Sequence, residues 1–155
     1  MLLLLFNTHK EQYAINCVHI VEVIPHLLLQ PIPMTPLYVA GAVNYRGTAL
    51  PVIDISQLID GSPCTNLIST RIILIDIDFG LSGEKKTIGL LAEKVTQTVK
   101  TPKGWSPLQK KDGSLFIDSS AIGHEMVQWF EPSKMLPANL PQSLFMDSTQ
   151  REDTL

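Results

Sequence analysis

The stretch Tyr38–Ile59, YVAGAVNYRGTALPVIDISQLI, decides the fold. Two runs rich in β-branched or aromatic residues, 39–43 and 49–55, flank the tetrapeptide Asn44-Tyr45-Arg46-Gly47, and this pattern predicts a β-hairpin. Arg46 is the one strong charge near the bend, where a fixed backbone would orient its guanidinium toward a carboxylate. Two interpretations stay open, because Arg46 could pair with an acid of its own chain or bind a partner.

Outside the hairpin, short apolar runs predict further strands. They lie at Leu2–Phe6, Tyr13–Cys17, Arg71–Phe79, Thr87–Leu91, Leu115–Ile122 and Glu125–Phe130.

Short stretches with helical spacing separate some of these strands. Val18–Ile24 and Ala92–Val99 carry apolar residues at helical intervals, which predicts a short helix or turn at the first and a short helix at the second. Ser56 is a predicted N-cap for one helical turn, and Pro132 opens a last short helix through Leu136.

Composition excludes several classes of protein. The 155 residues suffice for one sizeable core, and hydrophobic residues make up 45% of them. The net charge is −3, and the densest basic runs, Lys85-Lys86 and Lys110-Lys111, have two residues each. Binding of nucleic acid depends on how many phosphates are neutralised, so no nucleic-acid partner is expected.

Nothing in the sequence indicates a metal, a cofactor or a membrane span. Cys17 and Cys64 are far apart and lack metal-ligand spacing, so both are expected to be inert thiols in a reducing cytoplasm. The N-terminal MLLLLF is too short to cross a bilayer or to serve as an export signal, and it is interpreted as the first strand.

A weak internal repeat runs through the chain. Residues 13–24 match 88–99 at an offset of 75, and residues 52–59 match 129–136 at an offset of 77. The repeat predicts two similar small β-barrels that pack against each other. The counterpart of the Asn44–Gly47 turn is 121–124, which lacks an arginine, and this one-sided arginine favours a partner-binding role for Arg46.

The spaced pattern Gly41-x-x-Asn44-x-Arg46-Gly47, followed by LPVIDI at 50–55, resembles the signature of the CheW-like domain family. The resemblance covers about residues 1–137 and implies an all-β fold of two packed, SH3-like, five-stranded barrels. Residues 138–155 would then be a partly disordered tail. The connection at 101–113, which is basic and contains Trp105, has no counterpart that the resemblance identifies.

The resemblance also implies a function. The family implies a non-catalytic cytoplasmic adaptor, without cofactor, that joins methyl-accepting chemoreceptors to a CheA-type histidine kinase at membrane receptor arrays. The matching positions make Glu22 and Arg46 an expected ion pair that shapes the surface. The expected partner-binding residues are Ile20, Val21, Glu22, Asn44, Arg46 and Gly47.

Other functions stay open at this point. A chemosensory system that controls pilus-based surface motility would use the same kind of adaptor. A small-ligand module could use the groove between the barrels. Catalysis is disfavoured, because no nucleophile with an adjacent base is recognisable around the four histidines, His9, His19, His26 and His124.

Overall fold

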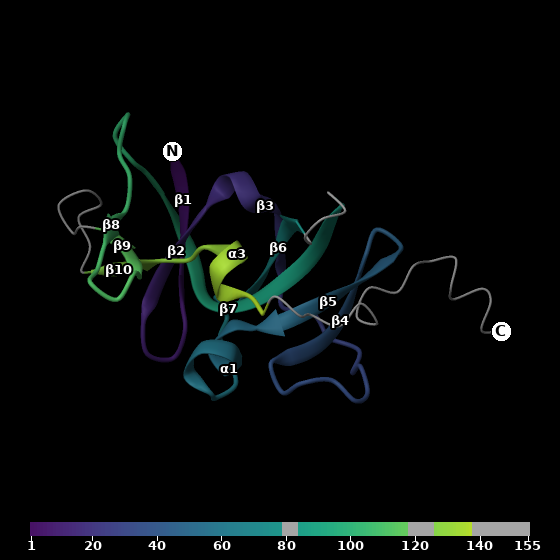
Figure 1. Ribbon diagram of the computed structural model, residues 1–155. Coiled ribbons are helices and arrows are strands. Elements are labelled where there is room, and N and C mark those ends of the chain that lie inside the picture. The colour runs from purple at the N-terminus through teal and green to yellow at the C-terminus, as the bar shows by residue number, and fades with distance from the viewer. Residues whose placement is uncertain (79–83, 118–125, 138–155) are drawn as a thin grey trace.

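Two β-sheets, A and B, share one long strand at the centre of the computed structural model (Figure 1). The structure describes residues 1–78, 84–117 and 126–137. Sheet A contains β1 (Leu2–Asn7), β2 (Gln12–Asn16), β8 (Leu108–Gln109), β9 (Leu115–Ile117) and β10 (Val127–Trp129). Sheet B contains β3 (Ile20–Pro25), β4 (Val39–Tyr45), β5 (Thr48–Asp54) and β6 (Arg71–Asp78).

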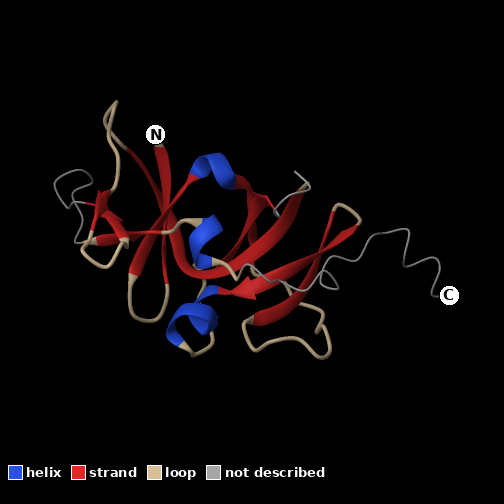
Figure 2. Cartoon of the chain, in the orientation of Figure 1, coloured by secondary structure: helices blue, strands red, loops and turns tan. Residues whose placement is uncertain are grey.

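Within residues 1–78, 84–117 and 126–137, three short helices lie where strands end (Figure 2). They are the 3-10 helix η1 (Cys17–His19) and the α-helices α1 (Ile55–Asp60) and α3 (Pro132–Met135). The predicted all-β class is therefore confirmed, as are the central hairpin, the first strand and the proline at the start of the last helix.

The shared strand is β7 (Lys85–Lys100), which pairs first with β6 and then with β1. The helix predicted at Ala92–Val99 is wrong, because this stretch is where β7 passes from sheet B to sheet A. Lys94 has a φ of 48° at this bend. Val95 and Val99, which suggested a helical face, pack into two different cores on either side of the sheets.

The helix predicted at Val18–Ile24 is also largely wrong. Only the single 3-10 turn of η1 forms, with Asn16 Oδ1 accepting a hydrogen bond from Val18 N at 3.1 Å. The β-branched residues that follow pair with β6 instead, and their backbone groups are satisfied in that ladder.

The predicted N-cap at Ser56 is wrong by two residues. Asp54 caps α1, with Oδ1 accepting from Gln57 N at 3.1 Å, while Ser56 is fully buried inside the first turn. For the strand predicted at Leu115–Ile122, the structure shows β9 only to Ile117, and residues 118–122 lie outside the described residues.

Three hydrophobic clusters hold the sheets together. Alternate residues of β1 face opposite sides, so Leu4 and Phe6 enter the core between the sheets while Leu3 and Leu5 enter the core of sheet A. β6 divides in the same way between the shared core and the core of sheet B. Burial on both faces explains why these strands are continuous apolar runs.

The parallel strand pairs recur at the offsets of the sequence repeat. Val52 of β5 pairs in parallel with Gly89 of β7, and Trp129 of β10 pairs in parallel with Ala14 of β2. The offsets within this quartet are again 77 and 75 residues. Each sheet therefore contains strands from both halves of the chain. The domain boundary at residue 137 stays a prediction, because residues 138–155 lie outside the described part.

Candidate functional site

The turn between β4 and β5 fixes the backbone of Arg46. Tyr45 and Thr48 are paired, so the loop has two residues, Arg46 with φ 50° and Gly47 with φ 85°. Positive φ at both positions is typical of the type I′ turn, which matches the twist of a hairpin. Asn44 Oδ1 accepts a hydrogen bond from Gly47 N at 3.0 Å and closes the turn.

The side chain of Arg46 is held from two sides yet stays exposed. Its guanidinium carbon lies 5.1 Å from the centre of the Tyr45 ring, a cation–π distance, and its Nη2 is 3.9 Å from Glu22 Oε2. The side chain of Arg46 is nevertheless 81% exposed, and that of Glu22 is 44% exposed. An ion pair this exposed is worth less than about 1 kcal/mol, so a partner's carboxylate can replace Glu22.

Tyr45 completes this group by donating its hydroxyl hydrogen to Glu22 Oε2. This hydrogen bond to the carboxylate is the largest cause of a raised pKa for Tyr45, and the Arg46 charge acts in the opposite direction. Among the described strands, β3 and β4 are the edges of sheet B, so this contact joins the two edges. We call Glu22, Tyr45 and Arg46 the hairpin cluster.

The sequence-predicted site residues divide between this cluster and its surroundings. The expected Glu22–Arg46 pair is present, and Asn44 and Gly47 form the turn below it. Val21 is the extra residue of a bulge in β3 and is 45% exposed. Ile20, by contrast, is partly buried against the core between the sheets, on the other side of the strand.

Sequence reasoning missed Tyr45 as a member of the site. Its position directly before Arg46 was visible, but its contact with Glu22 joins residues 23 positions apart. Only the curvature of sheet B brings these two side chains within hydrogen-bonding distance.

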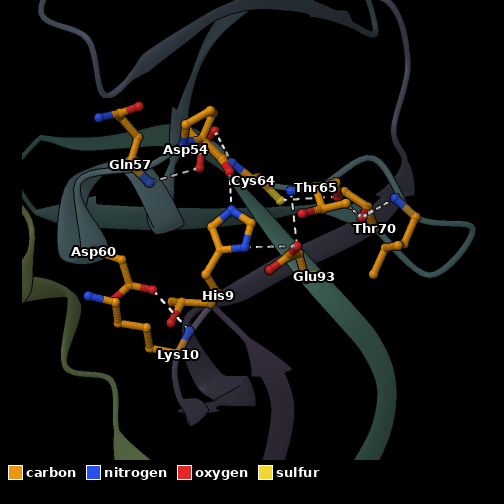
Figure 3. A network of polar contacts seen from close by, with 12 residues as sticks. His9, Lys10, Asp54, Gln57, Asp60, Cys64, Thr65, Thr70 and Glu93 are labelled. Carbon is orange, nitrogen blue, oxygen red and sulfur yellow. Dashed lines mark hydrogen bonds and ion pairs between the residues drawn. The ribbon is translucent and has the colours of Figure 1, made fainter.

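A second polar group lies at the other end of β5 (Figure 3). Asp54 is 6% exposed, and its Oδ2 accepts from Cys64 N at 2.8 Å in addition to capping α1. Glu93, also buried, accepts from Thr65 N at 2.9 Å and lies 3.8 Å from His9 Nδ1. Both carboxylates satisfy backbone N–H groups of the 61–70 loop, which is a structural role.

The side chains of this network do not form a reactive group. Both cysteines are free, and burial, together with the charges of Asp54 and Glu93, raises the pKa of Cys64 to about 12, so its thiol stays protonated at neutral pH. Within the described ranges, no three His, Cys, Asp or Glu residues are grouped to hold a metal ion.

Further observations concern ligands and membranes. The space between the sheets is filled by the shared core, including Phe6, Tyr13 and Phe130, whose rings contact one another. A small open hollow of about 260 Å³ lies beside His9 and Glu93. Among the residues that the structure describes, no helix is long and apolar enough to cross a membrane.

The described chain is a small, β-rich domain of two sheets with an exposed, anchored arginine at a hairpin tip. The model of the CheW-like domain matches residues 2–139, so the chain belongs to the CheW-like domain family. Proteins of this family are non-catalytic scaffolds of chemotaxis signalling, and the chain is accordingly a chemotaxis scaffold and not an enzyme.

Individual relatives agree with this assignment. A probable chemotaxis protein CheW of Rhizobium etli is 25% identical over 130 residues, covering 77% of this chain and 80% of the relative. A chemotaxis protein CheW of Rhizobium meliloti is 24% identical over 94 residues, 61% of this chain and 57% of the relative. The crystal structure of the scaffolding protein TtCheW from Thermoanaerobacter tengcongensis has the same fold, with a TM-score of 0.67, 21% identity and coverage of 84% of this chain and 83% of that chain.

We expect Gly47→Val to destabilise the central hairpin. A β-branched side chain at a φ of 85° costs about 1–2 kcal/mol, which lowers the melting temperature by roughly 2–8 °C in a chain of this size. Thermal unfolding followed by circular dichroism measures the change. Gly47→Asn is the matched control, because asparagine tolerates positive φ; equal melting temperatures for wild type and Gly47→Val would contradict the prediction.

Proposed function

We propose that this chain couples methyl-accepting chemoreceptors to a CheA-type histidine kinase in the cytoplasm, at membrane receptor arrays. Membership of the CheW-like domain family and relatives that carry the name chemotaxis protein support the proposal. The structural observation that carries it is the exposed Arg46, held at the tip of a rigid turn.

Arg46 has the properties of an interface anchor. Its backbone is fixed by the type I′ turn and its guanidinium by Tyr45, so little conformational entropy is lost when it binds a partner. Arginine is enriched among the residues that dominate binding energy, and its planar donors recognise carboxylates in two-point contacts. The weak pair with Glu22 keeps the guanidinium oriented without burying it.

The segment that carries Glu22 exposes apolar side chains. Val21 and Val23 on β3 are 45% and 39% exposed, and both flank Glu22 along the strand. Val18, in the turn before β3, is also exposed. Exposed apolar residues beside an oriented charge are typical of a transient protein-binding surface.

A pull-down with kinase and receptors from the same cell tests the proposal. Wild type should bind both classes of partner. Arg46→Glu should weaken at least one contact about 30-fold, the effect of losing an anchor worth about 2 kcal/mol, while its melting temperature stays near that of wild type.

Lys10→Glu is the matched control, because Lys10 is exposed and the substitution makes the same change in charge. Normal binding by both variants would move the contact away from the hairpin cluster. If wild type bound neither a kinase nor a receptor, the coupling function itself would be overturned.

A further inference from the structure

The positive charge of this acidic chain is concentrated in one segment. Residues 96–117 contain four lysines, Lys100, Lys103, Lys110 and Lys111, and one acid, Asp112. The rest of the chain holds eight of the 12 basic residues and 14 of the 15 acidic ones, so it carries a net charge of −6 while this segment carries +3. Among the described residues outside the segment, seven basic and nine acidic residues give a net charge of −2, so the segment is a local attractor for anions.

The segment is an ordered part of sheet A. Trp105 packs on Trp129 of β10, with ring centres 5.9 Å apart, and Lys110 lies 5.5 Å from the centre of the Phe116 ring. The turn between β8 and β9 is closed by hydrogen bonds from Lys110 N to Ser114 O at 2.8 Å and from Gly113 N to Lys110 O at 3.0 Å. The aromatic contacts and the turn hydrogen bonds fix Trp105 and Lys110 within this segment.

The charge of these lysines is not neutralised within the described chain. In residues 1–78, 84–117 and 126–137, no carboxylate lies within ion-pair distance of their ammonium groups, and three of the four, Lys100, Lys103 and Lys111, are exposed. The one acid of the segment, Asp112, accepts hydrogen bonds from the backbone N–H and the hydroxyl of Ser114. These hydrogen bonds and, to a smaller extent, the charge of Lys110 lower the pKa of Asp112.

We propose that this basic surface, formed by residues 100–116, is a second docking site, and that it binds a short acidic polypeptide segment of a partner protein. In Figure 1 β8 and β9 lie at one end of the molecule, and the turn that joins β4 to β5, which carries Arg46, lies at the opposite end. The two surfaces can therefore be occupied at once. The inference does not depend on which partner Arg46 contacts.

Two observations favour a polypeptide over other anions. β8 is the last strand of sheet A among the strands described, so its outer edge can pair with the main chain of an incoming segment. Four lysines neutralise few phosphates, so a long nucleic acid or an anionic membrane would gain little affinity from them.

Fluorescence anisotropy with a labelled ten-residue polyglutamate peptide tests the proposal on the full chain. Wild type should bind the peptide saturably, and added salt should weaken the binding. The triple variant Lys100→Glu, Lys103→Glu and Lys111→Glu should bind at least about tenfold more weakly, since three surface ion pairs of roughly 0.5 kcal/mol each are lost. Lys110 is left unchanged so that its packing on Phe116 is retained.

The matched control is the triple variant Lys10→Glu, Lys85→Glu and Lys86→Glu, which makes the same change in net charge at exposed sites elsewhere. Circular dichroism verifies that both variants are folded. Peptide binding that survives in the control and is lost in the basic-surface variant supports the proposal. Equal loss in both variants, no binding by wild type, or tighter binding of a ten-nucleotide single-stranded DNA or of vesicles containing phosphatidylserine would overturn it. None of these results bears on the Arg46 pull-down, so the two proposals fail separately.

Discussion

Gly89→Val should lower the free energy of unfolding by about 3 kcal/mol, because the centre of sheet B has no space for a side chain at this position. A Cβ on Gly89 would lie 2.7 Å from Ile72 Cγ2 and 3.0 Å from Val52 Cγ2. Both methyl groups belong to fully buried, β-branched residues whose stiff side chains cannot swing away. The melting temperature should fall by about 6–12 °C in thermal unfolding followed by circular dichroism.

Gly104→Ala is the control for Gly89→Val. It introduces backbone strain without crowding, so it separates the two contributions to the loss of stability. Gly104 has a φ of 80°, but a Cβ there would meet no atom within 4 Å, so only the strain of about 1 kcal/mol applies. A Gly89→Val protein as stable as wild type, or no less stable than Gly104→Ala, would show that the core of sheet B is looser than the structure indicates.

Asp54→Ala should lower the free energy of unfolding by about 3 kcal/mol, because one carboxylate that accepts hydrogen bonds from two backbone N–H groups is lost. Its Oδ1 caps α1 at Gln57 N, and its Oδ2 accepts from Cys64 N, which anchors the following loop (Figure 3). Removing an N-cap costs about 1 kcal/mol, and leaving a buried N–H without a partner costs roughly 1–3 kcal/mol more. Chemical denaturation measures the free energy, and hydrogen exchange at the amides of Gln57 and Cys64 shows where protection is lost.

Asp54→Asn is the control for this prediction. The single amide oxygen of asparagine can replace one of the two carboxylate acceptors. About half of the loss in free energy of unfolding is therefore expected, and only one of the two amides, Gln57 or Cys64, should keep its protection from hydrogen exchange. A fully stable Asp54→Ala protein would mean that water or another side chain satisfies both N–H groups.

Local patterns predicted those parts of the fold that depend on neighbours in the chain. The turn at Asn44–Gly47 and the proline at the start of α3 were predicted because their conformations are set within a few residues. The two failed helices, at Val18–Ile24 and Ala92–Val99, lie where strands pass between cores. Apolar residues spaced three or four apart are typical of a helix, whereas here such residues pack into different hydrophobic cores along an irregular strand.

The candidate site shows the same division. The exposed arginine at the turn, the turn residues around it and the expected Glu22–Arg46 pair were all accessible from sequence and family resemblance. Tyr45 was missed, and Ile20 lies against the shared core instead of beside Arg46. The bulge at Val21 decides which β3 side chains face the hairpin, and a bulge is a property of strand pairing.

By itself the sequence determined the all-β class, the hairpin with its arginine, the weak repeat and the basic character of residues 101–113, because each depends on local composition and spacing. Tertiary structure alone decided that each sheet combines strands from both halves of the chain, and that β7 crosses between the sheets at Lys94. It also decided that Glu22 meets Tyr45 and that the basic surface lies at the end opposite Arg46. These features depend on which strands pair over long sequence separations. Each pairing is stabilised by burying apolar surface that several distant segments supply together.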